Sequence, residues 1–385
     1  MQKTLRGKDV ATGSSLEVAF DGAIDTVRSA AGPDEAYLSP GWIDVQVNGF
    51  AGVDYNSART SHEEIARSIE VLFSTGVTRF YPTVITGGPE DMRGALENLA
   101  RAKDALADGE AMDGFHVEGP HISPDDGPRG AHPKRWVRPP DVDEFHRWQD
   151  AARGHIRLVT VAPEWPQAPA YIEALTKESV VISIGHTNAS GAQIASAVAA
   201  GATMSTHLGN GAHQILQRHP NYIWEQLAED RLMASFIVDG VHLPASFLKV
   251  ALRAKGLERS VLVTDASSPA GAKPGRYSLG EQTVILTEDN RVILSDQDKL
   301  AGSALRMDHG VRNLMKLAGL SLPDAVTLAT TNPARVGAVP GRKSGLVAGD
   351  RADFVLFRFD PASLSIQVAA TYVSGRQVYS DPLLQ

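Results

Sequence analysis

Eight short apolar runs in the middle of the chain constrain its fold more than any other feature. Each run ends in a polar or glycine-containing turn, and together they span residues 41–49, 77–84, 113–119, 156–164, 180–187, 202–208, 232–240 and 260–266. Most are apolar at successive positions, which is typical of strands that are buried on both faces of a parallel sheet. Such a sheet needs covering layers on both sides.

Helix-like segments lie between many of these runs. One begins after Ser61, and others cover residues 89–108, 167–177, 190–200, 220–230 and 244–255, with apolar residues at helical spacing. Strands that alternate with helices indicate βα units. Eight such strands favour a closed (β/α)8 TIM-type barrel, and a doubly wound open sheet is the alternative from the pattern alone.

The two ends of the chain differ from this middle part. Residues 1–39 and 336–385 hold strand-like segments and turns, so we predict that they pair as a small β-sandwich domain beside a barrel of residues 40–335. Residues 276–300 predict a β-hairpin, inserted after the eighth strand, with Asp289 and Asn290 at its turn.

Composition excludes several classes of protein. The chain has 385 residues, a formal net charge of −8 and no cysteine. Disulfide scaffolds, cysteine-ligated metal sites and thiol nucleophiles are therefore excluded. The lack of cysteine and of a signal-peptide-like apolar stretch predicts a cytoplasmic protein. The acidic balance and the lack of a long apolar segment predict neither nucleic-acid nor membrane partners. Because a chain of this length folds without a metal, any bound metal would serve chemistry.

Polar side chains at the ends of the apolar runs predict a metal site. Catalytic groups of barrels gather at the C-terminal ends of the strands. Glu118, His186 and His207 lie at three such ends, and this ligand set suits Zn²⁺ or Fe²⁺ with one position open for water. Asp265 ends the eighth run and is a candidate general base. A capping or turn role is the alternative for each residue taken singly.

A second group of residues predicts an anion site. Arg218 would offer two parallel hydrogen bonds to an anion, together with Asn210, His213 and His242. A solvated surface arginine is the alternative. No G-x-S-x-G motif supports a serine hydrolase, and no Walker or Rossmann fingerprint is present.

A series of longer motifs runs nearly from end to end of the chain. They read PGWIDVQVNGFAG (40–52), FHVEGPHI (115–122), RGAH (129–132), SIGHTNA (183–189), THLGN (206–210), VDGVHL (238–243), LVTDASSPAG (262–271), LAGSAL (300–305), GVRNL (310–314) and TTNPAR (330–335). In this order they resemble the N-acetylglucosamine-6-phosphate deacetylase family of the amidohydrolase superfamily. The segment 345–357 resembles the closing strands of the superfamily's β domain.

The resemblance implies a fold, a reaction and a set of site residues. The fold is a (β/α)8 barrel with a small β-sandwich from both termini, and the reaction is metal-dependent removal of an acetyl group from an amino sugar phosphate. A neighbouring subunit completes the phosphate site in the family, which implies a homodimer. The implied residues are Glu118, His186 and His207 for the metal, Asp265 and His132 for catalysis, and Asn210, Gly211, Arg218 and His242 for the substrate. Gln46, a polar residue at the end of the first apolar run, is a further candidate for substrate binding.

The first strand bears on the number of metal ions. Many amidohydrolases carry His-x-His there, whereas this chain has Gln46-Val47-Asn48. Amides are poor Zn²⁺ ligands beside imidazole or carboxylate. We therefore expect one ion per chain, Zn²⁺ first and Fe²⁺ as the alternative.

Departures from the family pattern leave the substrate open. His121 replaces an aromatic residue, and the segment 210–226 differs from the family's usual Asn-Ala-Met stretch and the residues after it. The alternatives are an amidohydrolase that acts on another N-acyl amino sugar phosphate or small amide, and a catalytically silent phosphosugar-binding protein.

Overall fold

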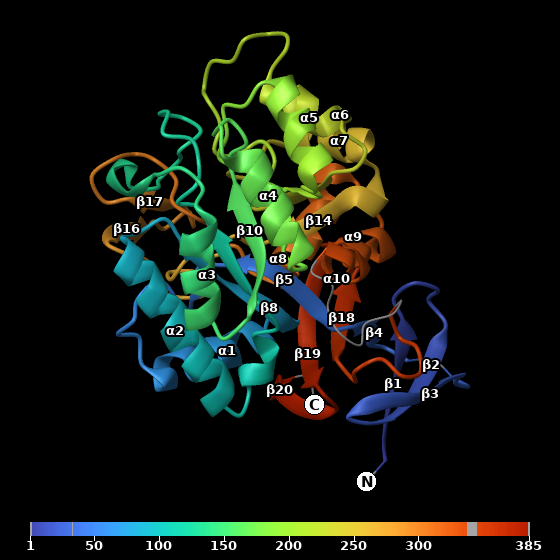
Figure 1. Cartoon of the computed structure of the whole chain (residues 1–385). Coiled ribbons are helices and arrows are strands. Elements are labelled where there is room, and N and C mark those ends of the chain that lie inside the picture. Colours follow the sequence, from blue (N-terminus) through green and yellow to red (C-terminus); the bar gives the residue numbers. More distant parts are fainter. Residues whose placement is uncertain (1, 33, 337–344, 384–385) are drawn as a thin grey trace.

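Eight parallel strands form a nearly closed barrel in the middle of the molecule (Figure 1). The computed structural model describes residues 2–32, 34–336 and 345–383. In barrel order the strands are β5 (Trp42–Val47), β8 (Val77–Ile85), β9 (Phe115–Glu118), β10 (Ile156–Val161), β11 (Val181–Ile184), β12 (Met204–Ser205), β13 (Met233–Ile237) and β14 (Ser260–Val263). All eight coincide with the predicted apolar runs, which confirms the barrel over an open doubly wound sheet.

The two end strands meet just beyond β5 and β14. Val47 forms a parallel bridge with Ala266, and the backbone N–H of Asp265 donates to the carbonyl oxygen of Gln46 at 3.0 Å. This contact closes the barrel at its C-terminal end. It also brings two predicted site residues together.

Helices cover the outside of the barrel (Figure 1). They are α1 (His62–Phe73), α2 (Pro89–Ala105), α3 (Val142–Ala151), α4 (Ala168–Lys177), α5 (Gly191–Ala200), α6 (Tyr222–Ala228), α7 (Ala245–Lys255), α8 (Met307–Asn313), α9 (Leu322–Ala329) and α10 (Thr331–Val336). Ser61 and Ser190 begin α1 and α5 with reciprocal capping boxes, which satisfy the free N–H groups of a first helical turn. Short helical turns are η1 (Gly109–Ala111), η2 (Lys134–Trp136), η3 (Leu257–Arg259) and η4 (Leu314–Ala318).

Apolar side chains fill the barrel and the layer between strands and helices. Val45, Leu158 and Val263 belong to an inner cluster that is at most 1% exposed at these positions. A larger cluster joins the outer faces of the strands to the helices. No helix among the described residues is long and apolar enough to cross a membrane.

Strands from both ends of the chain form a second sheet, which is mostly antiparallel. Its order is β20 (Arg376–Ser380), β19 (Ser365–Val373), β18 (Phe354–Asp360), β4 (Tyr37–Pro40), β1 (Lys3–Asp9), β2 (Ser15–Asp21) and β3 (Ala23–Ser29). The rings of Phe20 and Phe354 lie 5.0 Å apart although two strands separate β2 from β18. The sheet therefore curls until its two halves pack face to face, as the predicted sandwich requires.

The limits of the predicted domains stay predictions. Strand β4 ends at Pro40 and helix α10 ends at Val336, close to the predicted limits, but residues 337–344 lie outside the described part of the chain. A buried ion pair joins the two units, since Arg79 Nε lies 2.7 Å from Asp353 Oδ2.

The predicted hairpin after the eighth strand is a three-stranded sheet. It comprises β15 (Gly275–Leu279), β16 (Gln282–Leu286) and β17 (Val292–Leu294), and we call it the insertion sheet. Asp289 and Asn290 lie in the turn between β16 and β17, as expected. The short pair β6 (Gly49–Phe50) and β7 (Val53–Asp54) comes after the first barrel strand.

Candidate active site

A cavity of about 390 Å³ lies at the C-terminal end of the barrel. Its lining includes six of the residues predicted from the strand ends and motifs: Glu118, His132, His186, His207, His242 and Asp265. These residues come from six different segments of the chain. The closed barrel, which aligns the C-terminal ends of its strands, is what brings them together.

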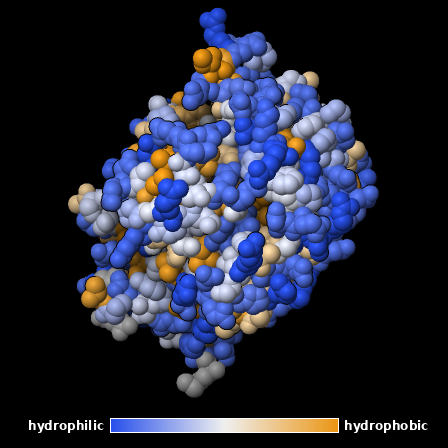
Figure 2. Space-filling model, turned by 90° about the vertical axis from the view of Figure 1, so that its left-hand side faces the viewer, coloured by the Kyte–Doolittle hydropathy of each residue, from blue (hydrophilic) through white to orange (hydrophobic). Residues whose placement is uncertain are grey.

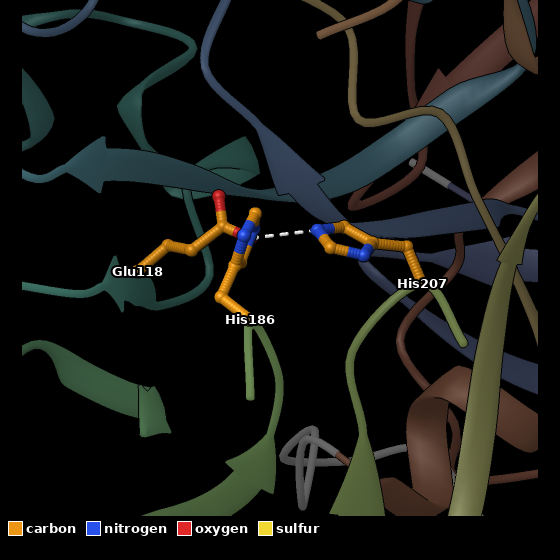
Figure 3. Close-up of side chains that lie close together, drawn as sticks. All are labelled: Glu118, His186 and His207. Atoms are coloured by element: carbon orange, nitrogen blue, oxygen red, sulfur yellow. Dashed lines mark hydrogen bonds and ion pairs between the residues drawn. The ribbon is translucent and has the colours of Figure 1, made fainter. Parts of the chain in front are cut away.

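Glu118, His186 and His207 line this cavity and form a buried cluster, with their side chains pointing toward one another (Figure 3). One ligand atom from each lies within 4.8 Å of the others. Glu118 Oε1 is 3.2 Å from His186 Nε2 and 2.9 Å from His207 Nε2. Although burial opposes it, the two imidazoles hold the pKa of Glu118 below its usual value.

The donor set fits a divalent cation. His186 Nδ1 donates to the carbonyl oxygen of Pro128 at 2.8 Å, so Nε2 is the ring nitrogen that faces Glu118. A carboxylate oxygen and two imidazole nitrogens that converge in a buried site need positive charge between them, which a divalent cation supplies. A backbone carbonyl that fixes the second imidazole nitrogen is the arrangement metal-binding histidines usually have.

Three of the site residues have strained backbones. His186 and Asp265 both have φ of +50°, and His207 has φ of +27°. Residues other than glycine rarely adopt these values, at a cost of about 1–3 kcal/mol each, and such residues cluster at functional sites. Directly after their strands, these residues turn so that the side chains face the cavity.

Asp265 is held by the two amides of the first strand. Asn48 Nδ2 donates to Asp265 Oδ1 at 2.7 Å and Gln46 Nε2 donates to the same oxygen at 3.1 Å. Burial, and then the charge of Glu118, raise the pKa of Asp265 to about 6. This environment suits a carboxylate that exchanges a proton near neutral pH.

Gln46 joins two carboxylates of the site. Its Nε2 also donates to Glu118 Oε1 at 2.9 Å, so both of its amide hydrogens are used by carboxylates. Its side chain is 1% exposed and does not line the cavity. Gln46 links the metal-site carboxylate to Asp265, and its role in substrate binding stays a prediction.

His132 lies beside the cluster with one nitrogen engaged. A hydrogen bond of 2.8 Å joins its Nδ1 to the hydroxyl of Thr86. Burial, and then the neighbouring His186, lower the pKa of His132 to about 3, so the ring is neutral at physiological pH. If the Thr86 hydroxyl donates to Nδ1, the proton of His132 is on Nε2.

Three of the predicted phosphate residues line the cavity, and two others, Arg218 and His213, do not. Asn210, Gly211 and His242 belong to its wall, and His242 Nδ1 lies 2.6 Å from Asp239 Oδ2. Arg218 is exposed and does not line the cavity of its own chain. His213 instead contacts the hydroxyl of Tyr222 through both its backbone N–H and Nδ1.

The surroundings of Gly211 explain why a glycine is suited to this position. Its φ is +55°, and a Cβ there would lie 2.7 Å from His186 Nδ1 and 3.1 Å from the carbonyl oxygen of Pro128. A side chain at this position would therefore disturb the contact that orients His186. Pro128 and Gly127 lie close to Gly211 and His213, respectively, so this part of the loop has little room for larger side chains.

Comparison with known proteins decides the family. The profile described as "Amidohydrolase family" matches residues 37–378. N-acetylglucosamine-6-phosphate deacetylase of Bacillus subtilis (strain 168) is 34% identical over 380 residues, covering 94% of each chain. The human enzyme of that name is 35% identical and covers 89% of this chain and 83% of its own.

The chain belongs to the N-acetylglucosamine-6-phosphate deacetylase family of the amidohydrolases. Solved structures agree. The deacetylase of Mycobacterium smegmatis is 32% identical with a TM-score of 0.87, and coverage is 98% of this chain and 100% of that one. The Thermotoga maritima deacetylase, at 28% identity and the same coverage, has a TM-score of 0.83.

Some residues of this amidohydrolase site could not be identified from the sequence. Thr86 comes just after the second apolar run, which is only a weak indication of a role in the site. The backbone carbonyl of Pro128 cannot be recognised from the sequence at all. Gln282 and Lys299 line the cavity from the insertion sheet and the segment after it. The sequence predicts that hairpin but not where it packs.

Proposed function

We propose that this chain removes the acetyl group from N-acetylglucosamine 6-phosphate, giving glucosamine 6-phosphate and acetate. The observation that carries the proposal is the convergence of Glu118, His186 and His207 beside Asp265 in one cavity. The identity of the substrate is inferred from the names of the similar enzymes of Bacillus subtilis and human. A binding protein without activity would need neither the metal cluster nor the buried carboxylate.

We propose one divalent ion per chain, held by Glu118, His186 and His207. Zn²⁺ is the expected ion and Fe²⁺ the alternative, because imidazole and carboxylate ligands suit both. Such an ion supplies a water-derived nucleophile at neutral pH and polarises the amide carbonyl. Gln46 and Asn48 donate hydrogen bonds to Asp265, which leaves no second set of strong ligands on the first strand.

Asp265 is assigned the proton transfers. Its Oδ1 accepts from Asn48 and Gln46, which leaves Oδ2 for the proton of the attacking water. Asp265 then passes this proton to the leaving nitrogen, because an amine departs only when protonated. His132, neutral and engaged through Nδ1, is assigned as donor from Nε2 to the developing oxyanion.

The phosphate is assigned to Asn210, Gly211 and His242 of one chain and Arg218 of a second copy. Arg218 is exposed and away from the cavity of its own chain, a position from which it could serve a neighbour. The homodimer is thus part of the proposal. A cytoplasmic location and the absence of nucleic-acid or membrane partners stay predictions from the sequence.

An amidohydrolase that acts on a different N-acyl amino sugar is the second candidate. The observation that favours it is the altered wall at residues 210–213, where Gly211 packs against His186 and His213 against Tyr222. The chemistry at the metal cluster would be unchanged. Only the group that fills the rest of the cavity would differ.

Acetate release by the purified protein tests the function. We expect release from N-acetylglucosamine 6-phosphate, much slower release from N-acetylglucosamine, and about one metal ion per chain in the same sample. A metal-loaded protein that releases no acetate from either sugar would reject this substrate. In that case a panel of N-acyl amino sugar phosphates would test the second candidate.

A further inference from the structure

The insertion sheet forms a wall of the active-site cavity. Leu279, Gln282 and Lys299 all line the cavity from this sheet or the segment after it. Gln282 Nε2 donates to the carbonyl oxygen of Ala131 at 2.7 Å, next to His132. The insertion is therefore tied to the loop that carries a proposed catalytic residue.

A second hollow continues from the cavity on this side. It has a volume of about 470 Å³ and shares His132, Gln282 and Lys299 with the cavity. None of residues 210–214, nor His242, borders it. Figure 2 shows that the face of the molecule bearing the insertion sheet is largely hydrophilic. A group bound there would lie away from the assigned phosphate position.

Cations dominate the lining of this hollow, in a chain whose net charge is −8. Its charged residues are Arg129, Lys134, Arg135 and Lys299 against Glu281 and Asp296. Two of the cations are already paired: Arg129 with Asp126, and Arg135 with Glu281 at 2.6 Å.

Lys299 lies between the two spaces without a direct ion pair among the described residues. Its ammonium group has no hydrogen bond or ion pair with any residue in the described ranges, and the nearby Asp298 pairs with Arg291 at 3.1 Å. Partial burial, and then the charge of Arg129, lower the pKa of Lys299. A half-buried ammonium group without a partner favours an anionic ligand, because charge taken from water needs compensation.

We propose that Lys299 and the hollow beside it bind the carboxylate group of those amino sugar phosphates that carry one in addition to the 6-phosphate. The inference rests on the proposed function and adds these N-acyl amino sugar phosphates to N-acetylglucosamine 6-phosphate as substrates. That carboxylate can be carried by the acyl chain or by the sugar ring. Both sources present the same group to Lys299.

Two pairs of substrates test this proposal and distinguish the sources. N-succinyl-glucosamine 6-phosphate is compared with its neutral succinamoyl analogue, and N-acetylmuramic acid 6-phosphate with its neutral lactyl amide. We expect at least one carboxylate to be preferred over its neutral partner by about tenfold or more in kcat/KM, about 1.4 kcal/mol. The preferred pair identifies the source.

Variants assign the preference to Lys299. Lys299→Met should abolish it by lowering kcat/KM for the carboxylate substrates far more than for the neutral partners, and Lys299→Arg should restore part of it. Lys177→Met is the matched control, since Lys177 is an exposed residue of α4 that forms an ion pair with Glu173 away from the cavity, and it should retain the full preference. Activity on the neutral partners shows that each variant is folded.

Two results would overturn the inference. One is equal kcat/KM within both pairs for the wild-type protein, and the other is a preference that survives in Lys299→Met. N-acetylglucosamine 6-phosphate is assayed alongside. Its hydrolysis without any carboxylate preference would reject this inference alone, whereas no hydrolysis of it would reject the proposed function.

Discussion

Asn48 Nδ2 lies 2.7 Å from Oδ1 of Asp265, at the seam where the first and last strands of the barrel meet. Gln46 donates to the same oxygen. Both amides therefore orient the carboxylate through Oδ1, and Oδ2 makes no hydrogen bond with the described residues. One carboxylate oxygen is fixed and the other is free for proton transfer.

Asp265→Asn should keep this hydrogen-bond geometry but abolish proton transfer by the side chain. The Oδ1 atom of the new amide can still accept from Asn48, but the amide cannot take a proton. We expect kcat to fall by about 10²–10⁴-fold, with metal content and melting temperature close to those of the wild type. Steady-state kinetics on metal-loaded protein measures this, and near-normal turnover would remove Asp265 from the mechanism.

Arg218→Ala should weaken binding of phosphorylated substrate. We expect KM for N-acetylglucosamine 6-phosphate to rise by about tenfold or more, since losing a charged hydrogen bond removes about 1.5–3 kcal/mol. KM for unphosphorylated N-acetylglucosamine should not change. Equal effects on both sugars would reject phosphate binding by Arg218.

A mixed sample tests whether Arg218 acts on the neighbouring subunit. In a heterodimer of Arg218→Ala and Asp265→Asn chains, one site would combine an intact Asp265 with an intact Arg218 from the other chain. We expect about half of the wild-type activity per dimer, with a low KM. A high KM in this sample would instead place Arg218 in the site of its own chain.

The barrel and the metal cluster could be predicted from the sequence because their signals are local. Each strand is a continuous apolar run, and a charged residue that interrupts such a run, as Glu118 does, is conspicuous. The apolar run at residues 202–208 predicts even the two-residue strand β12 (Met204–Ser205). Helix α3 was not predicted, since its segment between Val142 and Ala151 has mostly polar residues.

The rest of the site depends on how distant segments pack. Lys299 lines the cavity only because the insertion sheet packs against the loop at Ala131, and no pattern in residues 276–300 encodes that contact. Gln46 was predicted as a substrate residue from its place on the first strand. It contacts two carboxylates because Glu118 and Asp265 converge on it from other strands.

Removal of the metal should abolish activity and lower stability without unfolding the protein. Without a cation, Glu118 Oε1 and the Nε2 atoms of His186 and His207 face one another in a buried site. We expect chelation to lower the melting temperature by several degrees, because an ion that binds only the folded state stabilises it. Adding one equivalent of Zn²⁺ should restore both properties. Unchanged activity after complete chelation would contradict the metal-dependent reaction.

His121 should make stability fall at acidic pH. Its ring packs between Trp148 and Tyr171, and Nε2 is buried without a partner among the described residues. Burial lowers the pKa of His121 to about 4, against about 6.5 in an unfolded chain. Between these values the unfolded state binds a proton that the folded state does not, so His121 costs stability as pH falls through this window.

His121→Phe removes this dependence and restores the aromatic character usual at the position. The free energy of unfolding of the variant relative to the wild type should rise by about 2 kcal/mol between pH 8 and pH 5, which is about 1.5 pH units of linkage at 1.36 kcal/mol each. Urea unfolding at both pH values measures it. Comparing the two proteins at each pH cancels the contribution of the other titrating groups, so a difference that does not change with pH would show that His121 protonates equally in the folded and unfolded states.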